Sequence, residues 1–377
     1  MIKDAELETA LAEANLPGAV AIITGPEGVR YSRAFGVADV GSGAAMAEDT
    51  ICQIASMTKA LVSVGAMQLV EQGRLSLDDD IGAVLPDLAH PQVLTGFDAA
   101  GKPQTRPANR ALTLRHLLTH TSGFGYPFVQ TEVLRYCEAM GLPPIVALST
   151  LNMPLMFDPG ERWEYGISID WIGLAIEAVT ERRLGDYLTE HVFAPLGMNA
   201  TAFRPALPEG AARVHVRTAE SGLAPIPVYL GTSEFDMGGG GLTSTAPDYA
   251  RFLQMMLNGG KLEGARILAP ETVAEMIRNQ VAPLRAGAMG SAMPELAQPY
   301  DTFPDQHTGW GLGFLINPEQ GPAGRSPGSL AWAGIFNSYY WIDPVKGVAG
   351  VFMSQLSPFG DPGALSAFAA LERMAYA

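Results

Sequence analysis

Cysteine is scarce in this sequence, and its scarcity excludes two kinds of protein. Cys52 and Cys137 are the only cysteines, and neither belongs to a Cys-x-x-Cys pair or to a metal-ligand spacing. Two cysteines cannot form the disulfide framework that holds small secreted proteins together. We therefore expect two buried, reduced thiols and no cysteine-based metal site.

Positive charge is also in short supply. The chain has 24 Lys and Arg residues against 39 Asp and Glu residues, which gives a formal net charge of −15, and no stretch gathers enough Lys or Arg to reverse it locally. A surface with this charge repels phosphate backbones and anionic lipids. We expect neither a nucleic-acid partner nor a membrane partner.

Long apolar runs are missing as well, although 47% of the residues are hydrophobic. No run reaches the roughly 20 residues that cross a bilayer, and residues 1–7 lack the basic start and apolar stretch of a secretory signal. A chain of 377 residues with 17% charged residues can bury a large core. These features predict a globular cytoplasmic protein. They leave its oligomeric state, monomer or homodimer, open.

The N-terminal residues predict a helix, a hairpin and a second helix. Apolar residues recur at helical spacing over residues 2–15. Two β-prone runs, 19–23 and 31–37, flank the turn residues 25–28, which favours an antiparallel hairpin. The helical pattern returns over residues 56–72.

The C-terminal residues become β-like again after a middle region rich in helix signals. Residues 309–316, 330–342 and 348–353 have the pattern of strands, and a last helix is expected over residues 362–377. The sheet would thus draw strands from both ends of the chain.

These elements predict an α+β fold with two parts. Residues 1–80 and 226–377 would form an α/β domain in which helices flank an antiparallel sheet. Residues 81–225 would form a mostly helical domain. We expect the active site in the cleft between them.

Residues 56–59, Ser-Met-Thr-Lys, carry the strongest chemical signal. Residues three apart share a face of a helix, so Lys59 would lie beside the Ser56 hydroxyl. The apolar residues that follow predict a buried helix, and burial disfavours the ammonium form of Lys59. Its amine could then accept the serine proton, while the helix N-terminus would stabilise an oxyanion. This spacing, known from serine β-lactamases and penicillin-binding proteins, predicts a serine nucleophile.

Two further segments follow in a set order. Residues 157–170 contain a turn, an aromatic stretch ending at Tyr165 and a helix start, and residues 332–341 begin with Trp-Ala-Gly. Together with residues 114–123 and 238–245, they make the chain similar, over nearly its whole length, to the serine β-lactamase superfamily. Within that superfamily it resembles the family VIII carboxylesterases. The resemblance implies the β-lactamase/transpeptidase fold.

The resemblance also implies roles for individual residues. Ser56 corresponds to the acylated nucleophile, Lys59 to the motif lysine and Tyr165 to the tyrosine of the second motif. Residues Trp332 to Gly334 occupy the place of the Lys-Thr-Gly strand and are expected to bind substrate. The backbone N–H groups of Ser56 and Ile335 would hold the oxyanion.

Two departures from the superfamily pattern point to an uncharged substrate. Relatives that act on β-lactams or peptides usually have Tyr-x-Asn in the second motif, whereas Ile167 stands here in place of the Asn. They also have Lys-Thr in the third motif, where this chain has Trp332 and Ala333. Without a charge or hydroxyl to pair with a substrate carboxylate, the pocket suits a neutral ester better.

The sequence therefore predicts a serine carboxylesterase for short-chain esters, without a metal or other cofactor and with a small-molecule ester as its partner. Ser56 would attack the ester carbonyl, Lys59 and Tyr165 would take its proton, and Tyr165 would protonate the leaving alcohol. Which of the two is the first base stays open. The alternatives are a β-lactamase or D-amino-acid-specific peptidase, an acyltransferase using the same acyl-serine step, and an inactive scaffold or binding protein of the same fold.

Several other residues fit a functional pattern less well. Asp170 precedes an apolar periodic run, which favours a helix N-cap, although we keep it beside Tyr126 as a substrate-binding candidate. Ser326 lies in a Gly-x-Ser-x-Gly pattern but lacks the strand-to-helix setting of a nucleophile elbow and has no histidine after it, so a surface turn is expected.

The histidines and the glycine-rich run have structural explanations. His116 and His120 are four residues apart, yet there is no evident third zinc ligand, so packing is favoured. Residues 238–245 lack the lysine of a phosphate-binding loop, so a tight turn near the active site is expected instead.

Overall fold

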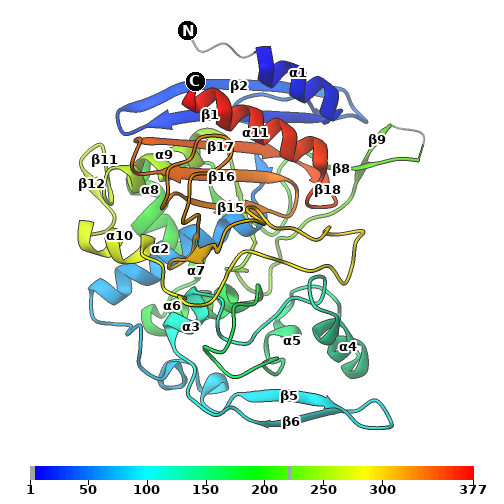
Figure 1. The fold of residues 1–377 in the computed structure, drawn as a ribbon, viewed down its shortest axis with the longest axis vertical. Coiled ribbons are helices and arrows are strands. Elements are labelled where there is room, and N and C mark those ends of the chain that lie inside the picture. The colour runs from blue at the N-terminus through cyan, green and yellow to red at the C-terminus, as the bar shows by residue number, and fades with distance from the viewer. Residues whose placement is uncertain (1–4, 220–221) are drawn as a thin grey trace.

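An antiparallel eight-stranded sheet forms the upper half of the structure (Figure 1). The computed structural model describes residues 5–219 and 222–377. β1 and β17 are neighbours in the sheet, with Ala19 opposite Ser354. The two ends of the chain therefore share one sheet, as the sequence predicted. In order across the sheet, the strands are β13 (Gly309–Trp310), β14 (Leu315–Ile316), β15 (Leu330–Gly334), β16 (Ser338–Asp343), β17 (Val348–Ser354), β1 (Gly18–Gly25), β2 (Gly28–Asp39) and β3 (Ala44–Ala45).

Helices cover both faces of this sheet, and β1 shows the consequence. Helices α1 (Ala5–Ala14) and α11 (Pro362–Tyr376) pack on one face, and α9 (Ala246–Leu257) packs on the other. Successive side chains of a strand point to opposite faces of the sheet. Because helices cover both faces here, every residue of β1 is buried. Ala21 joins the cluster that includes Phe368 of α11, whereas Ile22 joins the cluster that includes Phe252 of α9.

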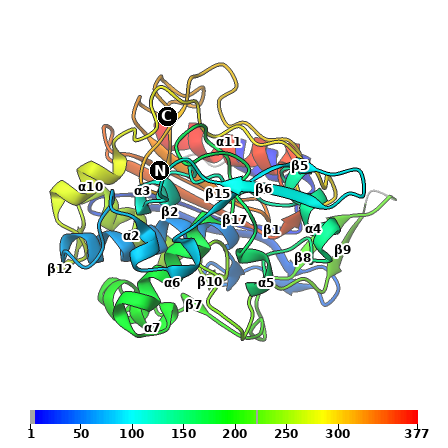
Figure 2. The same cartoon turned by 90° about the horizontal axis from the view of Figure 1, so that it is seen from below.

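Most of the remaining helices lie below the large sheet in Figure 1, and Figure 2 views the molecule from that side. Helix α2 (Thr58–Glu71) follows the short η1 (Ala55–Met57) and packs against α6 (Ser168–Thr180), which in turn contacts α3 (Leu114–Leu118). The other helices are η2 (Ile81–Ala83), η3 (Pro86–Leu88), α4 (Thr131–Met140), α5 (Leu148–Leu151), α7 (Leu184–Leu188), η4 (Thr189–Phe193), α8 (Ala194–Leu196) and α10 (Pro270–Ile277).

Short strands occur among these helices and form small sheets. The middle strand of one three-stranded sheet is β10, which continues from the glycine-rich run at residues 238–241. No helix in the described ranges, 5–219 and 222–377, has the length and apolar character to cross a membrane. The pairs and small sheets are β5 (Gln92–Phe97) with β6 (Pro103–Pro107); β4 (Cys52–Gln53), β10 (Leu242–Ser244) and β7 (Ala202–Phe203); β18 (Leu356–Ser357), β8 (Val214–Arg217) and β9 (Leu223–Ile226); and β11 (Lys261–Leu262) with β12 (Ala265–Arg266).

The hairpin predicted near the N-terminus is confirmed as β1 and β2. The expected strand over residues 330–342 is instead two strands, β15 and β16, because the backbone turns at Asn337, whose φ is 59°. Asparagine tolerates this left-handed conformation better than most residues do. Residues 1–4, which hold the expected start of the first helix and part of the N-terminal segment on which the cytoplasmic prediction rests, lie outside the described residues.

The Asn337 side chain fixes this turn. Its Nδ2 group donates hydrogen bonds to the carbonyls of Leu356 and Pro358, each at 2.8 Å. Its Oδ1 atom accepts from the Tyr339 hydroxyl and from the N–H of Gly360 and of Asp361. A fully buried amide with this many partners holds the β15–β16 connection, and with it residue 335, in one position.

Candidate active site

Ser56 is the middle residue of η1, just before α2, in a segment that packs against β15. Its neighbours Ala55 and Met57 are buried, whereas Ser56 is half-buried. Ala55 has a φ of 45°, a conformation that costs a non-glycine residue about 1–2 kcal/mol. The Tyr249 hydroxyl of α9 donates to the Met57 carbonyl at 3.0 Å and helps to hold the turn. The turn presents the serine hydroxyl at the surface of an otherwise buried segment.

Lys59 points back to Ser56 from the first turn of α2. Its Nζ atom lies 3.1 Å from Ser56 Oγ, 3.1 Å from Tyr126 Oη and 2.5 Å from the Gly239 carbonyl oxygen. An ammonium donates to all three. A neutral amine has two N–H groups and a lone pair, so it can donate to Tyr126 and Gly239 and accept the Ser56 proton.

The environment of Lys59 makes its ammonium easier to deprotonate than that of an exposed lysine. Its side chain is 1% exposed, and burial lowers its pKa from the usual value to about 7, although the Asp170 carboxylate opposes this shift. Other groups that face it are the rings of Tyr126 and Tyr165, with Nζ 4.7 Å from the Tyr165 ring centroid. The structure therefore places a lysine that can lose its proton near neutral pH beside the predicted nucleophile.

Tyr165 and Trp332 meet although they are far apart in the sequence. The Trp332 indole donates its Nε1 hydrogen to Tyr165 Oη at 3.1 Å, and the ring centroids are 4.9 Å apart. Burial raises the pKa of Tyr165, while its hydrogen-bond contacts with Ser56 and Trp332 lower it in part. Because indole only donates, the Tyr165 hydroxyl is free to donate its own proton toward Ser56.

Tyr126 and Asp170 lie behind Lys59 rather than along the groove described below. Both are buried, and Asp170 Oδ1 accepts from the Gly239 N–H at 2.8 Å. The N-cap prediction for Asp170 is wrong: α6 begins at Ser168, so Asp170 is its third residue and points into the protein. Sequence periodicity could not show that a buried lysine would face this carboxylate.

Gly334 and Ile335 bring the end of β15 against the Ser56 turn. A Cβ atom on Gly334 would lie 2.5 Å from the Ile54 carbonyl oxygen, so only glycine allows this approach. Ile335 follows directly and lies along the same groove as Ser56. The two predicted oxyanion donors, the N–H groups of Ser56 and Ile335, therefore belong to two segments that meet at the groove.

A narrow apolar groove begins at Ser56. None of the residues that line it is charged at neutral pH. The segment 289–300 forms much of one wall and is fixed by hydrogen bonds from Ala292 and Met293 to the Phe128 carbonyl. The lining residues are Ser56, Phe128, Val129, Tyr165, Met289, Gly290, Ala297, Gln298, Tyr300, Trp332, Ala333, Gly334, Ile335 and Phe359.

His120 is a further residue next to the site, and its proximity to Tyr165 was not predicted. Its ring centroid lies 4.9 Å from that of Tyr165, and its Nδ1 atom accepts from the Gly166 N–H at 3.4 Å. Burial lowers the pKa of His120, so the imidazole is neutral and packs on Tyr165 rather than carrying charge. The only sequence signal was its place in the segment 114–123.

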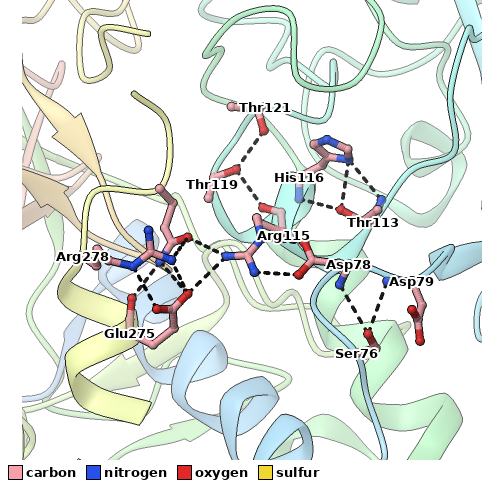
Figure 3. A network of polar contacts seen from close by, with 11 residues as sticks. Ser76, Asp78, Asp79, Thr113, Arg115, His116, Thr119, Thr121, Glu275 and Arg278 are labelled. Atoms are coloured by element: carbon pink, nitrogen blue, oxygen red, sulfur yellow. Dashed lines mark hydrogen bonds and ion pairs between the residues drawn. The ribbon is translucent and has the colours of Figure 1, made fainter. Parts of the chain in front are cut away.

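The helix before His120 is held by a polar network that Figure 3 shows. Arg115 Nε and Nη2 donate to the two carboxylate oxygens of Asp78 at 2.7 and 2.8 Å, and Nη1 lies 3.4 Å from Glu275 Oε1. His116 takes part in the cap of α3 through Thr113. α3 is thereby joined to the end of α10 and to the loop after α2, which fixes the start of the segment that carries His120.

The histidine pair and Ser326 do not form the sites that their sequence patterns suggest. His116 takes part in the cap of α3 whereas His120 packs on Tyr165, and the described residues contain no group of His, Cys, Asp and Glu that could hold a metal ion. Ser326 does lie between two strands, β14 and β15, and not at a strand-to-helix elbow. The expectation of a surface position is wrong, because Ser326 is 6% exposed and its N–H donates to the buried Asp343.

The glycine-rich run forms the tight turn that the sequence predicted. The N–H groups of Gly240 and Gly241 both donate to the Met237 carbonyl, and β10 follows directly. The Gly239 carbonyl accepts from Lys59. This turn therefore lies against the Lys59 amine and supplies its backbone acceptor.

Comparison with known proteins gives one consistent family. Residues 4–374 match the Beta-lactamase family. The chain is 30% identical to a lovastatin esterase of Penicillium rubens, over 92% of this chain and 91% of that protein. It is 33% identical to a monacolin J acid methylbutanoyltransferase of Aspergillus terreus, over 94% of this chain and 91% of that protein.

Solved structures agree with the sequence comparison. The LovD6 mutant of simvastatin synthase from Aspergillus terreus is similar, with a TM-score of 0.85 and 30% identity, covering 98% of this chain and 96% of that one. The predicted β-lactamase/transpeptidase fold is thereby confirmed. The relatives are enzymes of the acyl-hydrolase and acyltransferase type.

Proposed function

Since the chain belongs to the Beta-lactamase family, we propose that it is an acyl-serine enzyme that moves the acyl group of an uncharged ester to an alcohol. The observation that carries this proposal is the contact of 3.1 Å between Lys59 Nζ and Ser56 Oγ at the mouth of an apolar groove. Hydrolysis, in which water takes the place of the alcohol, is the second candidate. The methylbutanoyltransferase and the esterase among the relatives support one shared acyl-serine step with two acceptors.

The first half-reaction forms the acyl-enzyme. Ser56 Oγ attacks the ester carbonyl and its proton passes to Lys59 Nζ, while the N–H groups of Ser56 and Ile335 stabilise the oxyanion. The bond between the carbonyl carbon and the leaving oxygen then breaks. Tyr165, which is hydrogen-bonded to Ser56, gives its hydroxyl proton to the leaving oxygen, and the proton held by Lys59 passes to Tyr165, so both residues end the step as they began it. The products are acyl-Ser56 and a free alcohol.

The second half-reaction runs the same steps in reverse with a new acceptor. An alcohol gives its proton to the Lys59 and Tyr165 pair as its oxygen attacks the acyl carbon, and Ser56 recovers its own proton. The wall around the groove favours an organic acceptor, because its apolar residues offer contact to an organic molecule and few polar partners to water. This feature supports transfer ahead of hydrolysis.

The lining of the groove disfavours β-lactam and peptide substrates. These carry a carboxylate, which binds most strongly to a cationic partner, and the lining residues include neither lysine nor arginine. Trp332 is instead hydrogen-bonded to Tyr165. We expect turnover of nitrocefin to be far slower than turnover of a p-nitrophenyl ester.

A partition experiment tests the proposal. The protein is loaded from p-nitrophenyl butyrate in the presence of rising concentrations of a neutral alcohol, and the new ester and the free acid are measured by mass spectrometry. We expect an acyl-Ser56 peptide and a product ratio that shifts to the ester at alcohol concentrations well below that of water. Free acid alone would make the protein a hydrolase, and absence of acyl-Ser56 would overturn the acyl-serine proposal itself.

The width of the groove should set acyl-chain preference. A Cβ atom at residue 290 would lie 3.2 Å from the Val129 carbonyl oxygen, so Gly290→Val narrows the groove, whereas Met289→Ala widens it. We expect Gly290→Val to lower kcat/KM for octanoate relative to acetate by about 10-fold or more, and Met289→Ala to change the ratio in the opposite direction. The measurement is an acyl series with p-nitrophenol as the constant leaving group.

Val345→Ala is the control for this series, since Val345 is exposed at the turn between β16 and β17. Equal changes for acetate and octanoate in Gly290→Val would contradict an acyl chain in the groove. A parallel series of alcohol acceptors with a constant acyl group would then show whether the groove holds the acceptor.

A further inference from the structure

We propose that Asp170 is a positioning residue for Lys59: it holds the Gly239 turn against the amine and supplies the buried negative charge that lets Lys59 gain and lose a proton in place. This inference deepens the acyl-serine proposal and rests on it for its consequence in catalysis. The geometry behind it is independent of any substrate.

Gly239 is held from both sides. Its N–H donates to Asp170 Oδ1 at 2.8 Å, and its carbonyl oxygen accepts from Lys59 Nζ at 2.5 Å. A Cβ atom here would lie 2.4 Å from Asp170 Oδ2 and 2.9 Å from Tyr126 Oη. Only glycine therefore allows the turn to fit between the carboxylate, the phenol and the amine. The run of glycines at residues 238–241 places a backbone carbonyl where the lysine needs a third acceptor.

Asp170 is an unusual carboxylate in its own right. Its side chain is fully buried on α6, and its Oδ2 atom has no hydrogen-bond partner among the described residues. Burial raises its pKa, while Lys59 and the Gly239 N–H lower it in part. An unpaired oxygen on a buried carboxylate is costly unless a nearby charge offsets it. Lys59 is the cation that acts on it.

The other titratable groups around Lys59 cannot take this role. Burial raises the pKa values of Tyr126 and Tyr165 above the usual range, so both are neutral phenols in the resting protein. Burial lowers the pKa of His120, which is therefore neutral as well. Asp170 is the remaining ionisable group that faces Lys59 among the residues described.

The sign of the effect follows from the charges. A negative Asp170 favours the ammonium form of Lys59 and so raises its pKa against the effect of burial. Removing that charge should lower the Lys59 pKa further. The lysine would then be neutral over a wider pH range. The acidic limb of the pH profile of kcat/KM would therefore move to lower pH. Loss of a merely structural residue would lower stability but would not move this limb.

Asp170→Asn tests the inference because it keeps the shape and an acceptor for Gly239 while removing the charge. The chain has five lysines, and Lys102, Lys261 and Lys346 are exposed, so the buried Lys59 should stand apart in a spectrum of ¹³Cε-labelled lysine. We expect its titration midpoint to fall by about one pH unit or more in Asp170→Asn. The pH profile of kcat/KM for an ester should move in the same direction.

Asp343→Asn is the matched control, since Asp343 is an equally buried carboxylate that accepts from backbone N–H groups of Ser326 and Lys346, away from Lys59. It should leave the Lys59 midpoint unchanged. If Asp170→Asn does not fold, Gly239→Ala provides a second test, because its Cβ atom displaces the carboxylate and should also lower the midpoint. An unchanged or raised midpoint in a folded Asp170→Asn variant would overturn the inference.

The two proposals can fail separately. The lysine titration needs no substrate, so it reports on Asp170 even if no ester is turned over. Absence of acyl-Ser56 together with a shifted midpoint would reject the acyl-serine function and keep the Asp170 inference. Normal acylation of Ser56 with an unshifted Lys59 midpoint would keep the acyl-serine function and reject the Asp170 inference.

Discussion

Ser56→Ala is expected to lower ester turnover by about 10⁴-fold or more, because removal of a nucleophile ends covalent catalysis and leaves only binding and oxyanion stabilisation. The variant should fold normally, since Ser56 is half-buried and its neighbours Ala55 and Met57 keep their packing. Initial rates with p-nitrophenyl butyrate measure the effect, and a fluorophosphonate label detected on the Ser56 peptide of the wild type measures the nucleophile directly.

Ser326→Ala is the matched control, because Ser326 is a buried serine in a Gly-x-Ser-x-Gly pattern far along the chain. We expect it to keep full activity below its melting temperature. Retention of activity in Ser56→Ala, or loss of it in a folded Ser326→Ala variant, would show that another residue is the nucleophile.

Tyr165→Phe should lower kcat by about 10²- to 10⁴-fold, the usual range for loss of a general acid or base. The ring contacts with His120 and Trp332, each at 4.9 Å between centroids, remain in phenylalanine, so the change removes the hydroxyl alone. KM should change little, because the hydroxyl acts on the proton and not on binding of the acyl chain. Steady-state kinetics with one ester separate the two parameters.

Tyr187→Phe controls for removal of a buried tyrosine hydroxyl away from the site, where Tyr187 donates to Gln68 at 3.2 Å. It should leave kcat unchanged. If Tyr165→Phe raised KM and left kcat intact, Tyr165 would be a binding residue, and Lys59 alone would have to move the proton in both directions.

The local parts of the site could be predicted from the sequence, because local spacing determines them. Ser56 and Lys59 are three residues apart, and the apolar residues after them indicate a buried helix, which the structure contains. The hairpin of β1 and β2 follows in the same way from alternating β-prone runs around a turn. Likeness to the family then supplied Tyr165 and Trp332, whose positions no periodicity could give.

Contacts between distant segments account for what was missed. An aspartate before an apolar run is ordinarily a cap, and only the packing of α6 against α2 turns Asp170 toward Lys59. The sequence offers Tyr126 only as a substrate-binding candidate, whereas in the structure its hydroxyl lies 3.1 Å from Lys59. His120 was weighed as a metal ligand, yet its partner is the ring of Tyr165. In each case the partner is more than 40 residues away.

The pairing of β1 with β17 has a consequence for how the protein matures. Ser56 is made early by the ribosome, whereas the strand that carries Trp332 and Gly334 is made late. The Ser56 segment packs against that strand, which belongs to a sheet that includes β1 and β17. Closing such a long chain segment is slow compared with forming a local hairpin. A growing chain would therefore carry its nucleophile and lysine for most of synthesis without an assembled site, and ester hydrolysis should appear only after the last strands have left the ribosome.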